Sequence, residues 1–289
     1  MAAVSNILFL VHRLPYPPNK GDKVRSYHLL RHLLKSHRVF LGTFIDDPED
    51  EQYLPVLRAL CPDLHVERLQ PRTAKIRSLS ALATGEALTL AYYHRPSLAA
   101  WVQGVAAQHD LRASVVFSSA MAPYAQALAP DVPMLVDFVD VDSAKWSQYA
   151  DNHRWPLSWL YRREGRTLLA YERAVAAQAR QSFFVTSNEV ELFLRLAPEC
   201  TATVQAMSNG VDADFFAPDA ARPSPYPADE LPVVFTGAMD YWPNIDGVSW
   251  FTADVLPRLM AHWPRVHFYI VGRNPPSQVT ALAGTNVTV

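Results

Sequence analysis

The densest acidic cluster of this 289-residue chain contains Asp137, Asp140 and Asp142. Asp137 lies within an apolar run typical of a buried strand, and the other two follow where that strand should end. Ligands of parallel α/β sheets bind beyond the carboxyl ends of the strands, so Asp140 and Asp142 are candidate ligand-contacting residues. Two alternatives remain open: the three carboxylates bind a divalent metal ion, or Asp142 and Ser143 only cap the next helix.

A second candidate is a loop rich in proline that leads to Gly21 and Asp22, just before a helical pattern of apolar residues. Free N–H groups and the helix dipole favour anions at a helix N-terminus. Gly21 is therefore a candidate contact to a phosphate group, and Asp22 is a candidate N-cap. The alternative for Gly21 is that it only turns the chain.

Alternating strands and helices must position these residues. Uninterrupted apolar runs predict strands buried on both faces of a parallel sheet, and helical spacing of apolar residues separates them. This alternation predicts an α/β fold built from Rossmann-like units. The runs are at residues 7–11, 37–44, 66–69, 114–118, 134–139 and 182–187, and later at 233–236, 267–272 and 286–289.

Residues 208–218 interrupt the alternation and predict a joint between two α/β units. Asn209 and Gly210 both tolerate a positive φ, which predicts a tight turn, and Pro218 restricts the residue before it. A segment rich in proline continues to residue 232. We therefore expect an N-terminal domain at residues 1–207, a joint at 208–232, and part of a second domain at 233–289.

Composition excludes several classes of protein. The chain has 26 Lys and Arg against 28 Asp and Glu, a net charge of −2. It therefore lacks the overall excess of positive charge that is typical of proteins that bind nucleic acid. Cys61 and Cys200 lack metal-ligand spacing, which indicates free thiols in a reducing compartment. The first apolar run is too short for a signal peptide or a spanning helix. We expect a cytoplasmic protein.

Two segments combine basic and apolar residues as membrane-surface helices do. The first is 73–90, where Lys75 and Arg77 stand among leucines; the second is a predicted helix at 156–180. The alternative for both is a packed helix with a solvated polar face, its arginines paired with Glu164 and Glu172. The basic and aromatic residues of the second segment are Trp155, Trp159, Arg162, Arg163, Arg166 and Arg173.

Several stretches together resemble the GT-B glycosyltransferases of family 4, whose two Rossmann-like domains face each other across a cleft. Residues 209–218, NGVDADFFAP, are similar to the family signature NGVD…F.P, and residues 235–244 and 269–272 resemble the first strand-loop units of its donor domain. Residues 14–25 and 136–143 are similar to a subgroup associated with PEP-CTERM/exosortase exopolysaccharide systems.

The resemblance implies transfer of a sugar from a nucleotide-diphosphate donor to an exopolysaccharide or lipid-linked glycan, with retention of configuration. The nucleotide sugar is a substrate, so we expect no cofactor and no metal. We also expect peripheral contact with the cytoplasmic face of the inner membrane. Asp140 lies near the family's cleft histidine and is the catalytic candidate, Asp142, Lys145 and Trp146 are acceptor-side candidates, and Gly21, Gly237, Asn244 and Gly272 are donor-side candidates.

The chain departs from the family pattern in its second domain. The arginine and lysine that clamp the diphosphate correspond to Ala238 and Asn244, and the E-x7-E motif would follow residue 289. We therefore expect a fragment that is inactive alone, with residues 268–271 and 287–289 poorly covered. A non-catalytic sugar-nucleotide-binding or scaffold protein is the alternative. An NAD-dependent oxidoreductase would need a G-x-G-x-x-G motif after the first strand, where residues 12–20 contain no glycine.

Overall fold

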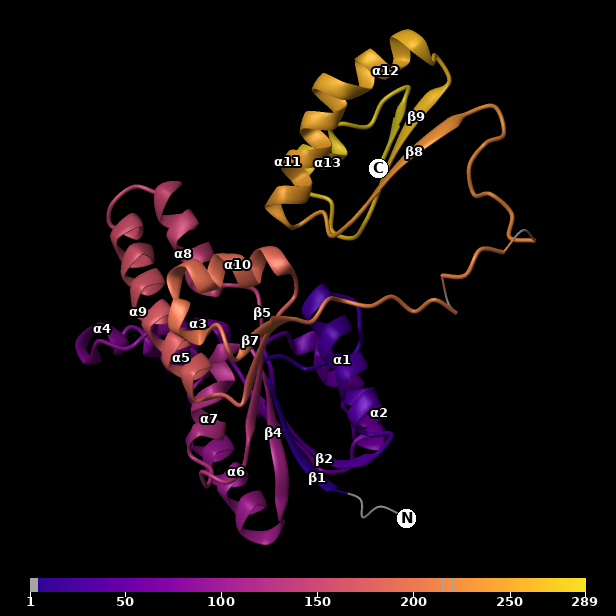
Figure 1. The fold of residues 1–289 in the computed structure, drawn as a ribbon. Helices are drawn as coiled ribbons and strands as arrows, with labels where there is room; N and C mark the ends of the chain where they lie inside the picture. The colour runs from indigo at the N-terminus through magenta and orange to yellow at the C-terminus, as the bar shows by residue number, and fades with distance from the viewer. Residues whose placement is uncertain (1–4, 215, 220) are drawn as a thin grey trace. The chain divides into compact units, whose positions relative to one another are not determined.

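The computed structural model describes residues 5–214, 216–219 and 221–289, so Phe215 of the joint motif lies outside the described residues. Contacts divide the chain into two compact units, residues 1–211 and residues 212–289. Figure 1 labels their helices and strands.

The first unit is built on a seven-stranded sheet in the order β3-β2-β1-β4-β5-β6-β7, and every pair is parallel. All six runs predicted for this unit form strands, and β7 adds a short strand at the edge. The predicted Rossmann-like α/β arrangement is therefore confirmed here. The strands are β1 Ser5–Val11, β2 His37–Ile45, β3 Leu64–Arg68, β4 Leu111–Phe117, β5 Met134–Val139, β6 Gln181–Phe184 and β7 Val204–Ala206.

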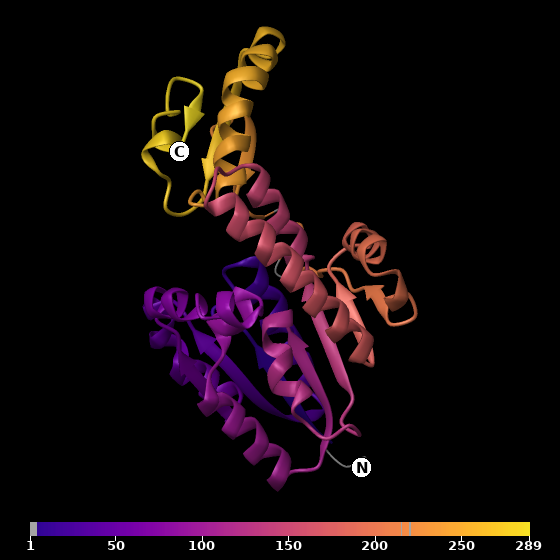
Figure 2. The same cartoon turned by 90° about the vertical axis from the view of Figure 1, so that its left-hand side faces the viewer.

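Two apolar clusters cover the two faces of this sheet. Helices α1 and α2 pack on one face through Leu30 and Leu57, while α6, α7, α9 and α10 pack on the other (Figures 1 and 2). The helices are α1 Gly21–Leu33, η1 Pro48–Tyr53, α2 Leu54–Leu60, α3 Pro71–Ser78, α4 Ala81–Thr84, α5 Leu88–Tyr93, α6 Pro96–Gln108, η2 Ser119–Met121, α7 Ala122–Gln126, α8 Asp142–Asp151, α9 Leu157–Gln178, α10 Ser187–Leu196 and η3 Pro198–Cys200.

Helices α8 and α9 form a tight pair in which glycine permits the close approach. A Cβ at Gly165 of α9 would lie 2.6 Å from Oγ of Ser147 and 3.0 Å from the carbonyl oxygen of Ser143, both in α8. The expected pairing of Glu164 and Glu172 with arginines is wrong, because both glutamates are buried and accept hydrogen bonds from other partners. The predicted helix itself is confirmed, with bounds Leu157–Gln178.

The second unit has a three-stranded parallel sheet in the order β10-β9-β8. One face of this sheet packs against the helices of the unit. Phe268 and Val287 lie on that face and are only 2% and 7% exposed, so the prediction that these strands are poorly covered is wrong for these two residues. The other face is open, as Val271 at 48% exposed shows. The elements are β8 Leu231–Thr236, α11 Trp242–Trp250, η4 Phe251–Val255, α12 Leu256–His262, β9 Val266–Val271, α13 Ser277–Thr280 and β10 Val287–Thr288.

The turn predicted at Asn209 and Gly210 is wrong. Neither residue has a positive φ, no hydrogen-bonded turn forms there, and a Cβ at Gly210 would contact nothing. Asn209 instead accepts a hydrogen bond from Arg25 at 2.9 Å, which ties this stretch to α1. A glycine is therefore not required at position 210 on conformational grounds.

Candidate functional site at the carboxyl edge of the seven-stranded sheet

The carboxyl ends of β4 and β5 are strained. Ser118 follows β4 with a φ of 77°, and Val139 ends β5 with a φ of 69°. A β-branched residue rarely adopts a positive φ, and such conformations cost on the order of 1–3 kcal/mol each. Strain of this kind clusters at functional sites, so these two adjacent strand ends mark the edge as a candidate site.

Asp140, Asp142 and Lys145 come together directly after β5. The Lys145 ammonium group donates to Oδ2 of Asp140 at 2.7 Å and to Oδ1 of Asp142 at 3.2 Å. Burial opposes the charge of Lys145, but the two carboxylates outweigh burial and raise its pKa. Both aspartate side chains remain more than 30% exposed, so the cluster is open to a ligand.

Two glutamate carboxylates, the partly exposed Glu189 and the buried Glu172, anchor the backbone that carries this cluster. The backbone N–H of Val141 donates to Glu189 at 2.7 Å, and the hydroxyl of Ser143 donates to Glu172 at 2.5 Å. Burial raises the pKa of Glu172 to about 8, although its hydrogen bonds from Ser143 act in the opposite direction. Because α8 has no side-chain cap, the predicted capping role of Asp142 and Ser143 is wrong.

A second group of charged residues follows β1 and β2. The Arg13 guanidinium donates to Asp46 at 2.9 and 3.0 Å and to Asp22 at 2.7 Å, so it joins the ends of two strands to the first turn of α1. Asp22 lies inside that turn and does not cap it, which corrects the predicted N-cap. Asp46 directly follows β2 and Arg13 lies two positions after β1, and this position at the end of a buried strand is the sequence signal that could have identified both residues.

His12 lies within this group and was also missed from the sequence. Its side chain is 17% exposed, its ring stacks on Phe117, and its Nε2 lies 3.8 Å from Oδ2 of Asp22. Its Nδ1 is buried and has no hydrogen-bond partner among the described residues. Burial and the neighbouring Arg13 lower the pKa of His12, so its imidazole is neutral at pH 7 and can accept a proton.

Asp137 has a structural role instead. Its two carboxylate oxygens accept from Arg25 at 2.7 and 3.1 Å, and both side chains are at least nine-tenths buried. Since Asp137 is paired with Arg25 while Asp140 and Asp142 share Lys145, the three carboxylates do not form the metal site considered above. Within residues 5–214, 216–219 and 221–289, no group of three potential ligands could hold a metal ion.

The other candidates of the first unit are placed as follows. Gly21 is the first residue of α1, and a Cβ there would contact nothing. Trp146 packs against Tyr149 and Tyr161 with ring centroids 5.9 and 5.3 Å apart, so it belongs to an aromatic cluster between α8 and α9. Trp146 thus points into helix packing, and its acceptor-side role remains a prediction.

Three donor-side candidates come together in the second unit, after β8 and β9. A Cβ at Gly272 would overlap the carbonyl oxygen of Gly237, and a Cβ at Gly237 would lie 2.8 Å from Nδ2 of Asn244. Asn244 in turn donates to the carbonyl of Ala238 at 2.9 Å. The backbone overlap requires glycine at position 272, whereas a Cβ at position 237 would require the Asn244 side chain to shift.

No protein-family model matches the sequence, and a comparison with curated proteins found no match. Solved structures share the fold. Sucrose-phosphate synthase from Thermosynechococcus elongatus aligns with a TM-score of 0.59 and 18% identity, over 96% of this chain and 65% of that chain. The HepE protein of Anabaena, in complex with UDP and glucose, aligns with a TM-score of 0.54 and 15% identity, over 98% and 68% of the two chains.

A trehalose-phosphate synthase from Burkholderia vietnamiensis aligns with a TM-score of 0.52 and 12% identity, over 96% of this chain and 66% of that chain. The chain therefore spans about two thirds of the length of these structures. At such identities the likeness establishes the fold alone. The chain has the α/β fold of GT-B glycosyltransferases, with a Rossmann-like first unit, which confirms the expected fold class.

Proposed function

We propose that the protein is a glycosyltransferase that moves a sugar from a nucleotide-diphosphate donor to an acceptor hydroxyl. The observation that carries the proposal is the open cluster of Asp140, Asp142 and Lys145 at the carboxyl edge of the sheet, in a chain with the fold of glycosyltransferases. One such structure holds UDP and glucose, which is the chemistry of a nucleotide-sugar donor.

The first unit would bind the acceptor. In the transfer, the acceptor oxygen bonds to the anomeric carbon of the sugar, the bond from that carbon to the diphosphate breaks, and the acceptor oxygen loses its proton. Asp140 positions the acceptor hydroxyl or takes up this proton, and Lys145 holds Asp140 in place. Asp142 and Trp146 complete the acceptor side.

The second unit would bind the donor. Gly237 and Gly272 let the segments that follow β8 and β9 approach each other closely, and we place the donor against their backbone; Asn244 fixes the turn that follows β8. Gly21 would contribute backbone N–H groups at the start of α1 to the phosphate side.

The finer features of the proposal rest on the sequence resemblance. They are membership of family 4, retention of configuration, and an exopolysaccharide or lipid-linked glycan acceptor of a PEP-CTERM system. The inner-membrane contact and the independence of a cofactor or metal belong with these, whereas the proposed cytoplasmic location and the lack of nucleic-acid binding rest on the two free cysteines, the short first apolar run and the net charge of −2. Among the described residues, no helix has the length and apolarity needed to cross a bilayer.

A thermal-shift panel tests the donor, using UDP-, GDP- and ADP-sugars with the protein as its gene encodes it. We expect one nucleotide class to raise the melting temperature and Gly237→Val to abolish that rise, because the added side chain would collide with Asn244. The control is Gly104→Ala, where an added Cβ contacts nothing. The absence of any shift would contradict donor binding.

Turnover is tested separately, by the release of nucleoside diphosphate when isolated membranes supply the acceptor. We expect release with the nucleotide class that shifts the melting temperature, and its loss in Asp140→Asn. Donor binding without turnover would favour the alternative, a non-catalytic sugar-nucleotide-binding or scaffold protein.

A further inference from the structure

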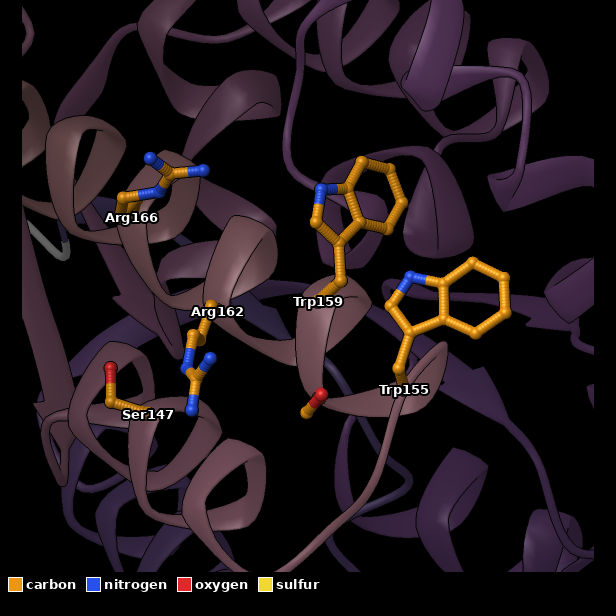
Figure 3. Close-up of a pocket in the computed structure, with 6 residues that line it drawn as sticks. Ser147, Trp155, Trp159, Arg162 and Arg166 are labelled. Atoms are coloured by element: carbon orange, nitrogen blue, oxygen red, sulfur yellow. The ribbon is translucent and has the colours of Figure 1, made fainter.

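Two tryptophans and two arginines surround a hollow on the surface of α9. Its volume is about 570 Å³, and it is lined by Ser147, Trp155, Ser158, Trp159, Arg162 and Arg166. Figure 3 shows both indole rings on the same side of the helix start, with Arg162 and Arg166 further along the helix. Positions 159, 162 and 166 recur at helical spacing within α9, so these three side chains share one face, and Trp155, two positions before the helix begins, lines the same hollow.

The apolar side chains of this face are exposed. Trp155 is 80% exposed, Trp159 is 51% exposed and Leu157 is 45% exposed. Large aromatic side chains gain most from burial, so a group of them in water at one helix end is typical of an interaction site. The α9 residues that pack on the sheet are different ones, such as Val175 and Ala176, so the exposed group is not needed for the core.

A second exposed apolar segment lies beside the first. Arg163, one turn after Trp159, donates to the carbonyl of Ala81 at 2.7 Å and to that of Glu86 at 3.0 Å, which fixes α4 against α9. The residues before and within α4 expose further apolar side chains: Ile76 is 71% exposed, Leu79 is 48% exposed and Leu82 is 39% exposed.

The charges around these residues are mostly positive. The exposed basic residues are Arg72, Lys75, Arg77, Arg154, Arg162 and Arg166, while the exposed acidic residues nearby are Glu86 and Asp151. Arg162 lies 3.7 Å from Asp151, but both side chains are more than 60% exposed, so the pair leaves the guanidinium available. A local excess of positive charge in a chain of net charge −2 favours an anionic partner.

We propose that this Trp-Arg face, formed by Trp155, Leu157, Trp159, Arg162 and Arg166 with Ile76, Leu79 and Leu82, docks on a bilayer that carries anionic phospholipids. Indole rings favour the headgroup region, arginine forks match phosphate oxygens, and the leucines reach the acyl boundary. The inference rests on the proposed transferase function, whose membrane contact it assigns to specific residues. It requires interfacial binding and no spanning helix.

Vesicle flotation tests the proposal with the full chain. We expect binding to phosphatidylcholine vesicles that contain phosphatidylglycerol, little binding to phosphatidylcholine alone, and weaker binding as salt rises. Phospholipids brominated on their acyl chains should quench the fluorescence of the wild type more than that of the double variant Trp155→Ala/Trp159→Ala. Equal binding to both kinds of vesicle, or no binding to either, would overturn the proposal.

Variants locate the surface. Trp155→Ala/Trp159→Ala and Arg162→Gln/Arg166→Gln should each weaken vesicle binding about tenfold or more. The matched controls are Trp263→Ala, an indole 52% exposed in the second unit, and Lys35→Gln/Arg58→Gln, which removes two exposed charges near α1 and α2 on the other face of the sheet. Equal losses in the controls, or none in the face variants, would overturn the assignment.

The nucleotide thermal shift distinguishes this failure from that of the proposed function. We expect the face variants to keep the wild-type melting temperature and the wild-type response to sugar nucleotides, because the altered side chains are exposed and lie outside the catalytic cluster. Loss of vesicle binding alone therefore tests the docking face, whereas loss of the nucleotide response tests the transferase.

Discussion

Lys145 Nζ lies 2.7 Å from Oδ2 of Asp140, and it also reaches Oδ1 of Asp142 at 3.2 Å. One ammonium group thus holds both carboxylates that follow β5, on a backbone that turns through the positive φ of Val139. The cluster is partly exposed, so the interaction contributes little to stability and is available to orient a ligand.

Asp140→Asn should reduce kcat at least tenfold while changing the free energy of unfolding by less than about 1 kcal/mol, because an exposed ion pair is worth little. Turnover at saturating substrate and chemical denaturation measure the two quantities. The control is Asp63→Asn, which breaks the exposed pair with Arg38 beside β3. If Asp140→Asn turns over at the wild-type rate, the catalytic assignment is wrong.

His12 should titrate below 6.5, because burial and Arg13 disfavour its charged form while Asp22, Asp142 and Asp46 only partly compensate. The unfolded chain binds this proton more tightly than the folded protein. The free energy of unfolding should therefore rise as the pH increases from the lowered pKa of His12 to 6.5, the pKa of an ordinary histidine. NMR titration of the imidazole resonances, assigned with His12→Gln, measures the pKa. A value at or above 6.5 would contradict the described environment.

Glu172 should have the opposite effect on the pH dependence of stability. Its pKa is raised from 4.5 to about 8, so the folded protein binds the proton more tightly and loses stability as pH rises through this window. Glu172→Gln removes this titration. Between pH 4.5 and about 8 the free energy of unfolding of the variant should therefore rise by more than about 1 kcal/mol relative to that of the wild type, since one pKa unit corresponds to about 1.4 kcal/mol. Parallel pH profiles for the two proteins would refute the prediction.

Glu164 should be required for stability. Its buried carboxylate accepts from the backbone N–H groups of Leu88 and Thr89 at 2.6 and 2.9 Å and from the Thr89 hydroxyl at 2.7 Å, so it caps α5 from α9. Glu164→Ala leaves three donors without an acceptor and should cost about 3 kcal/mol or more. Urea denaturation measures the loss, and the exposed Glu191→Ala in α10 should change stability by less than about 0.5 kcal/mol. Similar stabilities for the two variants would disprove the capping role.

The local features of the chain were predictable from the sequence. Apolar runs predicted the strands of both units except the short edge strand β7, because a parallel sheet buries both faces of its inner strands and the sequence shows this directly. Asp140, Asp142 and Lys145 were also found, since they lie within six positions of one another after a single strand. Their site roles remain predictions, but their proximity needs only one strand end and one helix turn.

The tertiary structure decided what depends on strand order and on burial. His12, Arg13, Asp22 and Asp46 meet because β1 and β2 are neighbours and α1 begins at their carboxyl edge, and no local pattern reveals that β1 and β2 are neighbours. Glu164 and Glu172 look like surface partners of arginines in the sequence. In the structure both are buried, and their carboxyl groups accept hydrogen bonds from backbone N–H groups and hydroxyls of other elements. The spacing of polar residues along a helix cannot predict these partners, because the partners come from distant parts of the chain.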